Sequence, residues 1–407
     1  MKKFWYSLTL VLLPTLYAQS VPPPELELGE SIPVGTALGN PEIRSAHDVW
    51  VEMIGRAERS IDIEEFYIAN EPNEPMQDVL NAICAAADRG VTIRILADAR
   101  MYQTYPISID TLGRHRHITT RLIDFGKLTG GIQHAKYFLI DGMDTYVGSQ
   151  NFDWRSLKHI HELGFRIHNK QIAAMYEDIF DFDWELASGV ESIKILRPKF
   201  SQPYPLPIHL AVQNGDSASI IPTFSPIGLI PDSTLWDETV LVRLIDEAQH
   251  SLTLQFLTYS PLEHHGKEYS VIDHAIRRAA QRGVKVKMIV ADWEKSSSAV
   301  RSLKELSALP NIEVAFTAIP EWSGGYVSFA RVEHCKYVVA DSATFWLGTS
   351  NCEKSYFYAS RNLGIAGANK FLAMQLSNIF YQSWNSPYKE FVTPNGTYFP
   401  RDHGEKK

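Results

Sequence analysis

The segment QHAKYFLID, residues 133–141, recurs as EHCKYVVAD at residues 333–341. In each copy a histidine is followed two residues later by a lysine, and an aspartate ends the segment. A small-residue turn that ends in asparagine follows each copy at the same spacing, as GSQN at 148–151 and GTSN at 348–351. One His-x-Lys pair would be a weak signal, but two copies in matched surroundings indicate a duplicated unit.

Side chains alternate between the two faces of a strand, so the histidine and lysine of each copy point the same way. Each half should therefore present an imidazole beside an ammonium group at one end of its sheet. The two aspartates fall at the far ends of these strands and should pair with backbone or a basic neighbour. The candidate catalytic residues are His134, Lys136, Asn151, His334, Lys336, Asn351 and Glu162, with Asp141, Asp341, Ser149 and Thr349 as supporting residues.

The flanking sequence is duplicated as well. AADRGVTIRILAD at 86–98 matches AAQRGVKVKMIVAD at 279–292, and in both a helical stretch ends at a glycine before an apolar strand. Earlier helical and strand patterns and a late helix also recur, the late helices at 173–187 and 372–384. Strands that alternate with helices predict α/β units with mixed or parallel sheets.

The sequence thus predicts two homologous α/β/α sandwich lobes related by a pseudo-twofold axis, with one active site at their interface. A length of 407 residues suits two domains. The predicted segments are a signal peptide at 1–18, an exposed leader at 19–40, a first lobe at 41–200, a linker at 201–234 and a second lobe at 235–407. The linker is rich in Pro, Ser and Gly, with an extended piece expected near Ala211 and Val212.

Composition describes a soluble globular protein, with 45% apolar and 21% charged residues. The net charge of −8 argues against a basic coat for gripping long duplex DNA, although a local basic cleft remains compatible with it. The first residues combine two lysines, an apolar run and small Ala18, which is typical of a cleaved secretory signal. The expected location is outside the cell, in the periplasm or in an endolysosomal lumen, and an uncleaved anchor is the alternative.

The cysteines are Cys84, Cys335 and Cys352, an odd number without CxxC spacing. Free thiols are the favoured interpretation, and a bridge between Cys335 and Cys352 remains open. No metal site, cofactor or protein partner is predicted, and the histidines at 159–168 lack convincing zinc spacing.

The residue types suit cleavage of a phosphodiester, which is a resistant anion. Its non-bridging oxygens must be neutralised and its leaving oxygen protonated. Lys136, Lys336, Asn151 and Asn351 can surround the phosphate as donors, and the turns at Ser149 and Thr349 could add more. One histidine can attack phosphorus to form a phosphohistidine, while the other donates a proton and then activates water.

One difference between the halves suggests which histidine attacks. Glu162 and Asn362 have the same sequence spacing, each lying 28 residues after the histidine of its own motif. If the fold returns Glu162 to His134, its carboxylate would hold the Nδ1 proton and stabilise the developing imidazolium. On that premise His134 is the nucleophile and His334 the acid and base.

The paired motifs resemble the phospholipase D superfamily, whose two HKD motifs form one active site. The stretches at 148–164, 224–254, 328–351 and 383–388 are similar to the branch that contains phospholipases D three and four, endolysosomal 5′-to-3′ exonucleases of single-stranded DNA and RNA. The resemblance implies a bilobal α/β/α fold, metal-independent hydrolysis and an acidic working range. The implied substrate is a single-stranded 5′ end.

The chain also departs from that branch. Three cysteines cannot form its several disulfides, and its membrane anchor is here a short signal. Glu64 and Glu65 lie on the first strand, where an acid in the cleft would repel phosphate, so a peripheral position is favoured for them. The alternatives are a phospholipase D or transphosphatidylase acting on a phospholipid headgroup, and a non-catalytic binding protein that keeps the fold.

Overall fold

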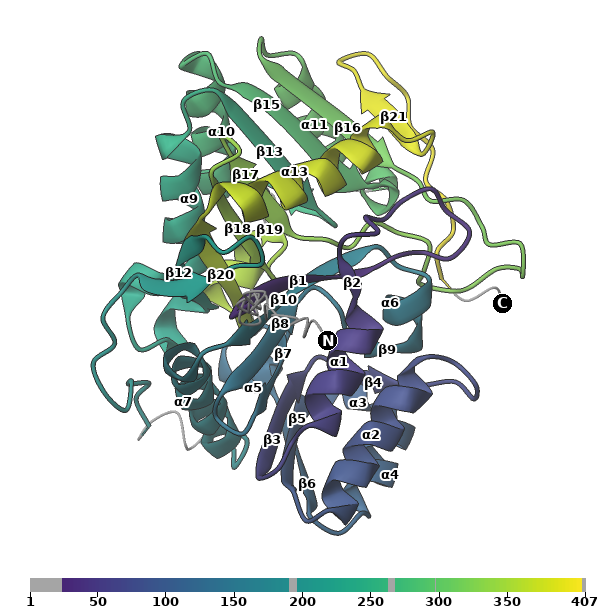
Figure 1. Cartoon of the computed structure of the whole chain (residues 1–407). Helices are drawn as coiled ribbons and strands as arrows, with labels where there is room; N and C mark the ends of the chain where they lie inside the picture. Colours follow the sequence, from purple (N-terminus) through teal and green to yellow (C-terminus); the bar gives the residue numbers. More distant parts are fainter. Residues whose placement is uncertain (1–23, 190–195, 263–267, 297, 405–407) are drawn as a thin grey trace, which may run out of the picture.

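Two β-sheets, one in each lobe, form the framework of the protein (Figure 1). The computed structural model describes residues 24–189, 196–262, 268–296 and 298–404. The sheet of the first lobe has the order β2 (Arg44–Ser45), β1 (Leu26–Ser31), β10 (Glu162–His168), β8 (Asp144–Gly148), β7 (Lys136–Ile140), β3 (Ser60–Glu65), β5 (Thr92–Asp98), β6 (Ile118–Ile123). The sheet of the second lobe has the order β11 (Ile208–Ala211), β12 (Ser217–Ser225), β20 (Asn362–Ala368), β18 (Thr344–Gly348), β17 (Tyr337–Ala340), β13 (Ser251–Phe256), β15 (Lys285–Ala291), β16 (Ile312–Thr317), β21 (Lys389–Val392).

The duplicated unit is visible in the strand order. The run β10-β8-β7-β3-β5-β6 in the first lobe matches β20-β18-β17-β13-β15-β16 in the second. In both, the central strand pairs in parallel with the next strand of the unit and antiparallel with the strand of the His-x-Lys motif. Two two-stranded ribbons also match, β4 (Ile68–Ala69) with β9 (Phe152–Asp153) and β14 (Tyr259–Ser260) with β19 (Cys352–Glu353). The predicted fold class of two homologous α/β lobes is confirmed.

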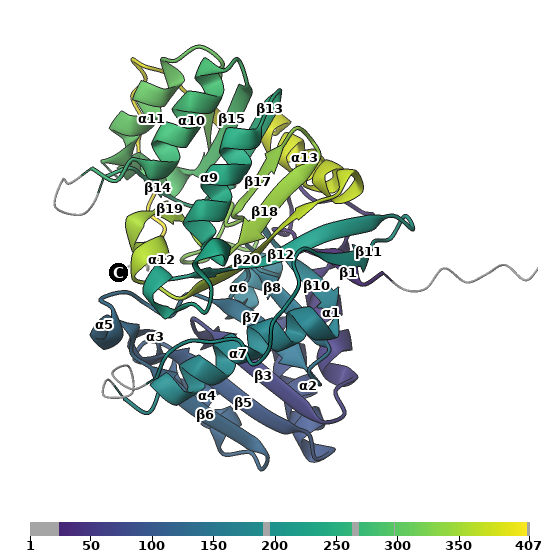
Figure 2. The same ribbon diagram turned by 90° about the vertical axis from the view of Figure 1, so that its left-hand side faces the viewer.

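Helices cover both faces of each sheet. The first lobe has α1 (Ala46–Gly55), α2 (Met76–Asp88), α3 (Ala99–Tyr102), α4 (Pro106–Gly113), α5 (Phe125–Leu128), α6 (Trp154–Lys158), α7 (Lys170–Leu186). The second has η1 (Ile227–Leu229), η2 (Ser233–Leu235), α9 (Asp237–Glu247), α10 (Val271–Gln281), η3 (Asp292–Ser296), α11 (Ala299–Ser307), α12 (Lys354–Tyr358), α13 (Lys370–Asn385). In Figure 2, α9 and α10 lie on one face of the second sheet and α13 on the other.

The two lobes share one hydrophobic core. Side chains of α7, α13 and the facing sides of both sheets form a single buried cluster, in which Phe165 of β10 contacts Phe345 of β18. The helices α1 and α2 cover a separate core in the first lobe, and α9 and α10 cover one in the second. Because the central core belongs to both lobes, their relative position is set by close packing.

Two segment assignments made from the sequence are wrong. Leu26–Ser31 belong to the predicted exposed leader, but they form β1, which pairs antiparallel along the whole of its length with β10. The predicted linker at 201–234 contains β11 and β12, and β12 pairs with β20 inside the second sheet. Short alternating strands beside Pro-rich sequence gave too weak a local signal, although the extended piece near Ala211 was predicted. The signal-peptide prediction, 1–18, lies outside the described residues.

The three cysteines are free thiols, with Cys335 and Cys352 buried and Cys84 partly buried. A Cys335–Cys352 bridge is therefore absent, in agreement with the favoured interpretation. Among the helices in the described parts of the chain, none is long and apolar enough to cross a membrane.

Asp141 and Asp341 close the far ends of their strands. The Asp141 carboxylate accepts hydrogen bonds from the backbone N–H groups of Glu58, Arg59 and Ser60, at 2.7–2.9 Å. Asp341 does the same at Gln249–Ser251, and both aspartates lie in the left-handed region with φ of 57° and 53°. These contacts are the pairing with backbone that the sequence pattern predicts.

Replacing Asp141 by alanine should lower the free energy of unfolding by about 1–2 kcal/mol, because three backbone donors lose one charged acceptor. The left-handed backbone adds to the cost for alanine. Urea denaturation would measure the loss, and Asp141→Asn, which keeps one acceptor oxygen and tolerates this backbone, should lose less. Equal losses in the two variants would contradict the role of the carboxylate.

Candidate active site

Backbone hydrogen bonds between the lobes bring the two motifs together. The His134 N–H donates to the carbonyl of Arg361 at 2.9 Å, and the His334 N–H donates to that of His161 at 2.9 Å. The return bonds run from Arg361 N–H to Ile132 and from His161 N–H to Val332. Each His-x-Lys segment is therefore held against the segment that precedes β10 or β20 of the opposite lobe.

The orienting contacts of the two imidazoles cross between the lobes. His334 Nδ1 forms a short hydrogen bond with Oε1 of Glu162, whereas His134 Nδ1 lies 3.0 Å from Oδ1 of Asn362. The premise that Glu162 returns to His134 is therefore wrong. The carboxylate belongs to the other histidine because β10 starts at the lobe interface, where it faces the motif of the second lobe.

The two lysines lie buried beside the histidines. Lys136 Nζ donates to the carbonyl of His134 at 2.7 Å, and Lys336 Nζ donates to that of His334 at 2.7 Å. Burial lowers the pKa of Lys136 to about 7, although the nearby carboxylates of Glu65 and Glu162 act to raise it. Burial also lowers the pKa of Lys336. An anionic substrate would restore the ammonium form, because a nearby negative charge favours it.

The electrostatic environment favours neutral imidazoles before substrate binds. Burial, with both lysines close by, holds the pKa of His134 and that of His334 well below the usual range. Burial also raises the pKa of Glu162 to about 8, against the opposing effect of Lys336. A phosphodiester in this site would bring a negative charge that favours the protonated forms of both imidazoles.

The asparagine turns lie in the same place. Asn151 and Asn351 are buried, and neither Oδ1 has a hydrogen-bond partner among the described residues. Ser149 and Thr349 are bound to the neighbouring strands instead. The Ser149 hydroxyl accepts from the N–H of Leu163 at 3.2 Å, and the Thr349 hydroxyl accepts from the N–H of Leu363 at 3.1 Å. Their own N–H groups bond to the same two residues. They support the turns rather than offer free donors.

The acids of the first strand are not peripheral, contrary to the favoured interpretation. Glu64 and Glu65 are both buried, and burial raises the pKa of each well above its usual range. Glu64 accepts from Gln133 at 3.2 Å and from Tyr137 at 2.7 Å, and Glu65 lies near Lys136, which opposes that rise in pKa. Both acids are therefore buried next to residues of the first motif segment.

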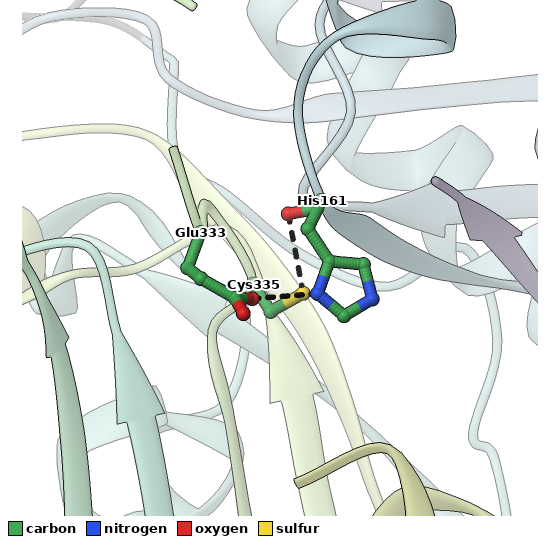
Figure 3. Close-up of side chains that lie close together, drawn as sticks. All are labelled: His161, Glu333 and Cys335. Atoms are coloured by element: carbon green, nitrogen blue, oxygen red, sulfur yellow. Dashed lines mark hydrogen bonds and ion pairs between the residues drawn. The ribbon is translucent and has the colours of Figure 1, made fainter. Parts of the chain in front are cut away.

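A second buried cluster supports the second motif. His161, Glu333 and Cys335 carry ligand atoms within 4.8 Å of one another, close enough to hold a metal ion (Figure 3). However, His161 Nδ1 lies 2.6 Å from Glu333 and Nε2 lies 2.9 Å from Glu30, so both ring nitrogens already have partners. Burial alone would lower the pKa of His161, but the two carboxylates raise it to about 10. The residues fit an imidazolium between two acids better than a metal centre.

Arg361 takes the matching place in the opposite half. Its guanidinium donates to both oxygens of Asp183, at 2.6 and 2.7 Å, and to the carbonyl of Ser225 at 2.8 Å. Thus the two residues whose carbonyls accept the backbone N–H groups of His134 and His334 each carry a buried cation on the side chain. Neither His161 nor Arg361 was predicted as a site residue. Each directly precedes one of the equally spaced residues Glu162 and Asn362, and that spacing is the signal that could have found them.

Comparisons with known proteins show the family to which this chain belongs. The family model described as cardiolipin synthase, PLD-like domain matches residues 50–184 and 241–384. The 5′-3′ exonuclease PLD3 of Macaca fascicularis is 31% identical over 401 residues, covering 90% of this chain and 80% of that protein. Phospholipase D Z of Dictyostelium discoideum is 29% identical over 390 residues, covering 90% and 91%.

The fold is also found among solved structures. Phosphatidylserine synthase of Haemophilus influenzae superimposes with a TM-score of 0.64 at 12% identity, covering 90% of this chain and 87% of that one. At that identity the similarity concerns the fold alone. The two matched regions, the relatives and the paired His-Lys motifs identify the chain as a member of the PLD-like domain family, within the phospholipase D superfamily, and as a phosphodiester hydrolase.

Proposed function

We propose that the protein is a 5′-to-3′ exonuclease of single-stranded DNA or RNA that works through a phosphohistidine and needs no metal ion. The proposed mechanism depends on the contacts that cross between the lobes, because the carboxylate of Glu162 contacts His334 and the amide of Asn362 contacts His134. The similarity to the PLD3 exonucleases supports the substrate. Export is part of the proposal and depends on the signal-like residues 1–18.

The crossed contacts reverse the roles expected from the sequence. Glu162 accepts the Nδ1 proton of His334, which leaves Nε2 of His334 free to attack and stabilises the imidazolium that develops. The Nδ1 atom of His134 faces the neutral amide oxygen of Asn362 rather than a carboxylate, so His134 loses and gains its proton more freely. We therefore assign His334 as the nucleophile and His134 as the acid and base.

Two steps complete the reaction. His334 Nε2 bonds to phosphorus as the bond to the leaving oxygen breaks, and that oxygen takes its electron pair and the proton of His134. Water then gives a proton to His134 and its oxygen bonds to phosphorus, while the P–N bond breaks and His334 is restored. Lys136, Lys336 and the two asparagines would stabilise the charge on the non-bridging oxygens.

A phospholipid headgroup is the second candidate substrate, favoured by the similarity to a protein named phospholipase D Z. The same four donors could surround the phosphate of either substrate. The choice can be tested with 5′-hydroxyl single-stranded DNA and phosphatidylcholine, each supplied to the protein in EDTA at about pH 5 and about pH 7.5. We expect nucleotide release and no choline release. Choline release without nucleotide release would contradict the exonuclease and favour the phospholipase D. A requirement for added metal would contradict the proposed mechanism.

The pKa directions predict an acidic optimum. The acid His134 must carry a proton when the leaving oxygen departs, and its pKa in the free enzyme lies below the usual value of 6.5. The protonated fraction of His134 therefore falls as pH rises. Ionisation of Glu162, whose pKa is about 8, offsets that fall, and the net loss of activity comes from the Lys136 ammonium, which is lost above about 7. We expect kcat/KM to fall at least about tenfold between about pH 5.5 and pH 8. A kcat/KM that rises over this range would contradict the assigned protonation states of His134 and Lys136.

A further inference from the structure

Two aromatic rings lie against His134. The Phe66 ring centroid is 5.2 Å and the Tyr356 centroid 4.9 Å from that of the imidazole. Phe66 directly follows β3 of the first lobe, and Tyr356 belongs to α12 of the second. Both rings are only partly buried although the imidazole between them is buried, so part of each remains free to contact a ligand.

The other half of the site is not built this way. The residue that follows β13 is Leu257, which matches Phe66, and the third residue of α6 is Ser156, which matches Tyr356 in α12. Within the described residues, aromatic contacts of this kind involve His134 and not His334. Of the two motif histidines, His334 therefore has a carboxylate partner and His134 lies against a pair of aromatic rings.

We propose that Phe66 and Tyr356 form a stacking subsite for the base of the leaving nucleoside. The inference depends on the proposed function and on His334 as nucleophile. In an in-line displacement the leaving oxygen lies opposite the attacking atom, so the leaving group falls on the His134 side. A nucleoside whose oxygen takes the His134 proton brings its base near these rings, and aromatic rings stack any base.

A quaternary ammonium is the other ligand that aromatic rings attract. Here the Lys136 ammonium already lies 5.0 Å from the centroid of Phe66. A second cation would meet repulsion from Lys136 and Lys336, so the charge distribution favours a neutral base over choline.

The test uses three 5′-hydroxyl oligodeoxynucleotides, one intact, one abasic at the first nucleoside and one abasic at the second. The product shows which nucleoside leaves: a nucleoside 3′-phosphate means the second, and a free nucleoside means the first. We expect removal of the leaving base to lower kcat/KM about 5- to 150-fold. The variants Phe66→Leu and Tyr356→Ser install the residues of the opposite half, and each should lower kcat/KM for the intact substrate. When either variant is assayed on the substrate that lacks the leaving base, the loss in kcat/KM should be smaller than the loss from the substitution multiplied by the loss from the missing base. Tyr381→Ser, on the exposed face of α13, is the matched control and should show no such coupling.

Each outcome has a distinct meaning. Coupling to the leaving base supports the subsite. Equal losses on all three oligonucleotides would show that the rings only pack against the catalytic groups, and coupling to the base that stays on phosphorus would move the subsite to the other side. Choline release that depends on Phe66 and Tyr356 would overturn the subsite in favour of an amine cage. If the unaltered protein cleaves none of the oligonucleotides, the proposed function itself fails.

Discussion

His334→Ala is expected to lower kcat by about 10⁴-fold or more and to prevent any covalent intermediate, because it removes the atom that bonds to phosphorus. His134→Ala should behave differently on an activated substrate such as thymidine 3′-(p-nitrophenyl phosphate). Its p-nitrophenolate leaves without a proton, so the first step survives. The second step is slow because no base activates water, and the phosphoryl group should remain on the enzyme.

The measurement is a burst of p-nitrophenolate equal to the enzyme concentration, followed by mass spectrometry of the peptide that carries the phosphoryl adduct. With His134→Ala the adduct should lie on His334. The reverse result, a burst from His334→Ala with label on His134, would restore the roles that the sequence suggested. It would also show that the carboxylate of Glu162 serves the acid rather than the nucleophile.

Arg361→Ala should lower the free energy of unfolding by about 3–5 kcal/mol, because it leaves the Asp183 carboxylate buried without its cation. The Arg361 side chain is 0% exposed and donates to three oxygens, so no water can replace it without rearrangement. The loss should appear in urea denaturation and in thermal unfolding.

Arg301→Ala is the control for that variant. Arg301 forms an exposed pair with Glu305 within α11, with side-chain exposures of 85% and 52%. Such a pair is worth about 0.5 kcal/mol or less. Similar losses in the two variants would mean that the Arg361 pair does not stabilise the contact between the lobes.

The sequence predicted the elements whose signal is local. Period-two strands and helices that end at Gly90 and Gly283 are encoded within about ten residues, so both copies of the unit could be recognised. β1 and β12 could not be assigned, because each becomes a strand through pairing with β10 or β20, far along the chain. Their own patterns are short and lie beside prolines.

The residue types of the candidate site were likewise readable, and His134, Lys136, His334 and Lys336 do lie together. The positions of Glu64 and Glu65 were misjudged, since an acid in the cleft would repel phosphate and a peripheral position was favoured, whereas both are buried. The structure offsets part of the cost of that burial with Tyr137, Gln133 and the nearby lysine.

By itself, then, the sequence determined that two copies of an α/β unit each supply an imidazole, an ammonium and an amide, because short-range periodicity and matched spacing encode these features. Only the tertiary structure decided that Glu162 orients His334 and that Asn362 faces His134. The physical reason is the core shared by both lobes, which packs the start of β10 against the second motif and the start of β20 against the first. Equal spacing within each lobe carries no information about that contact.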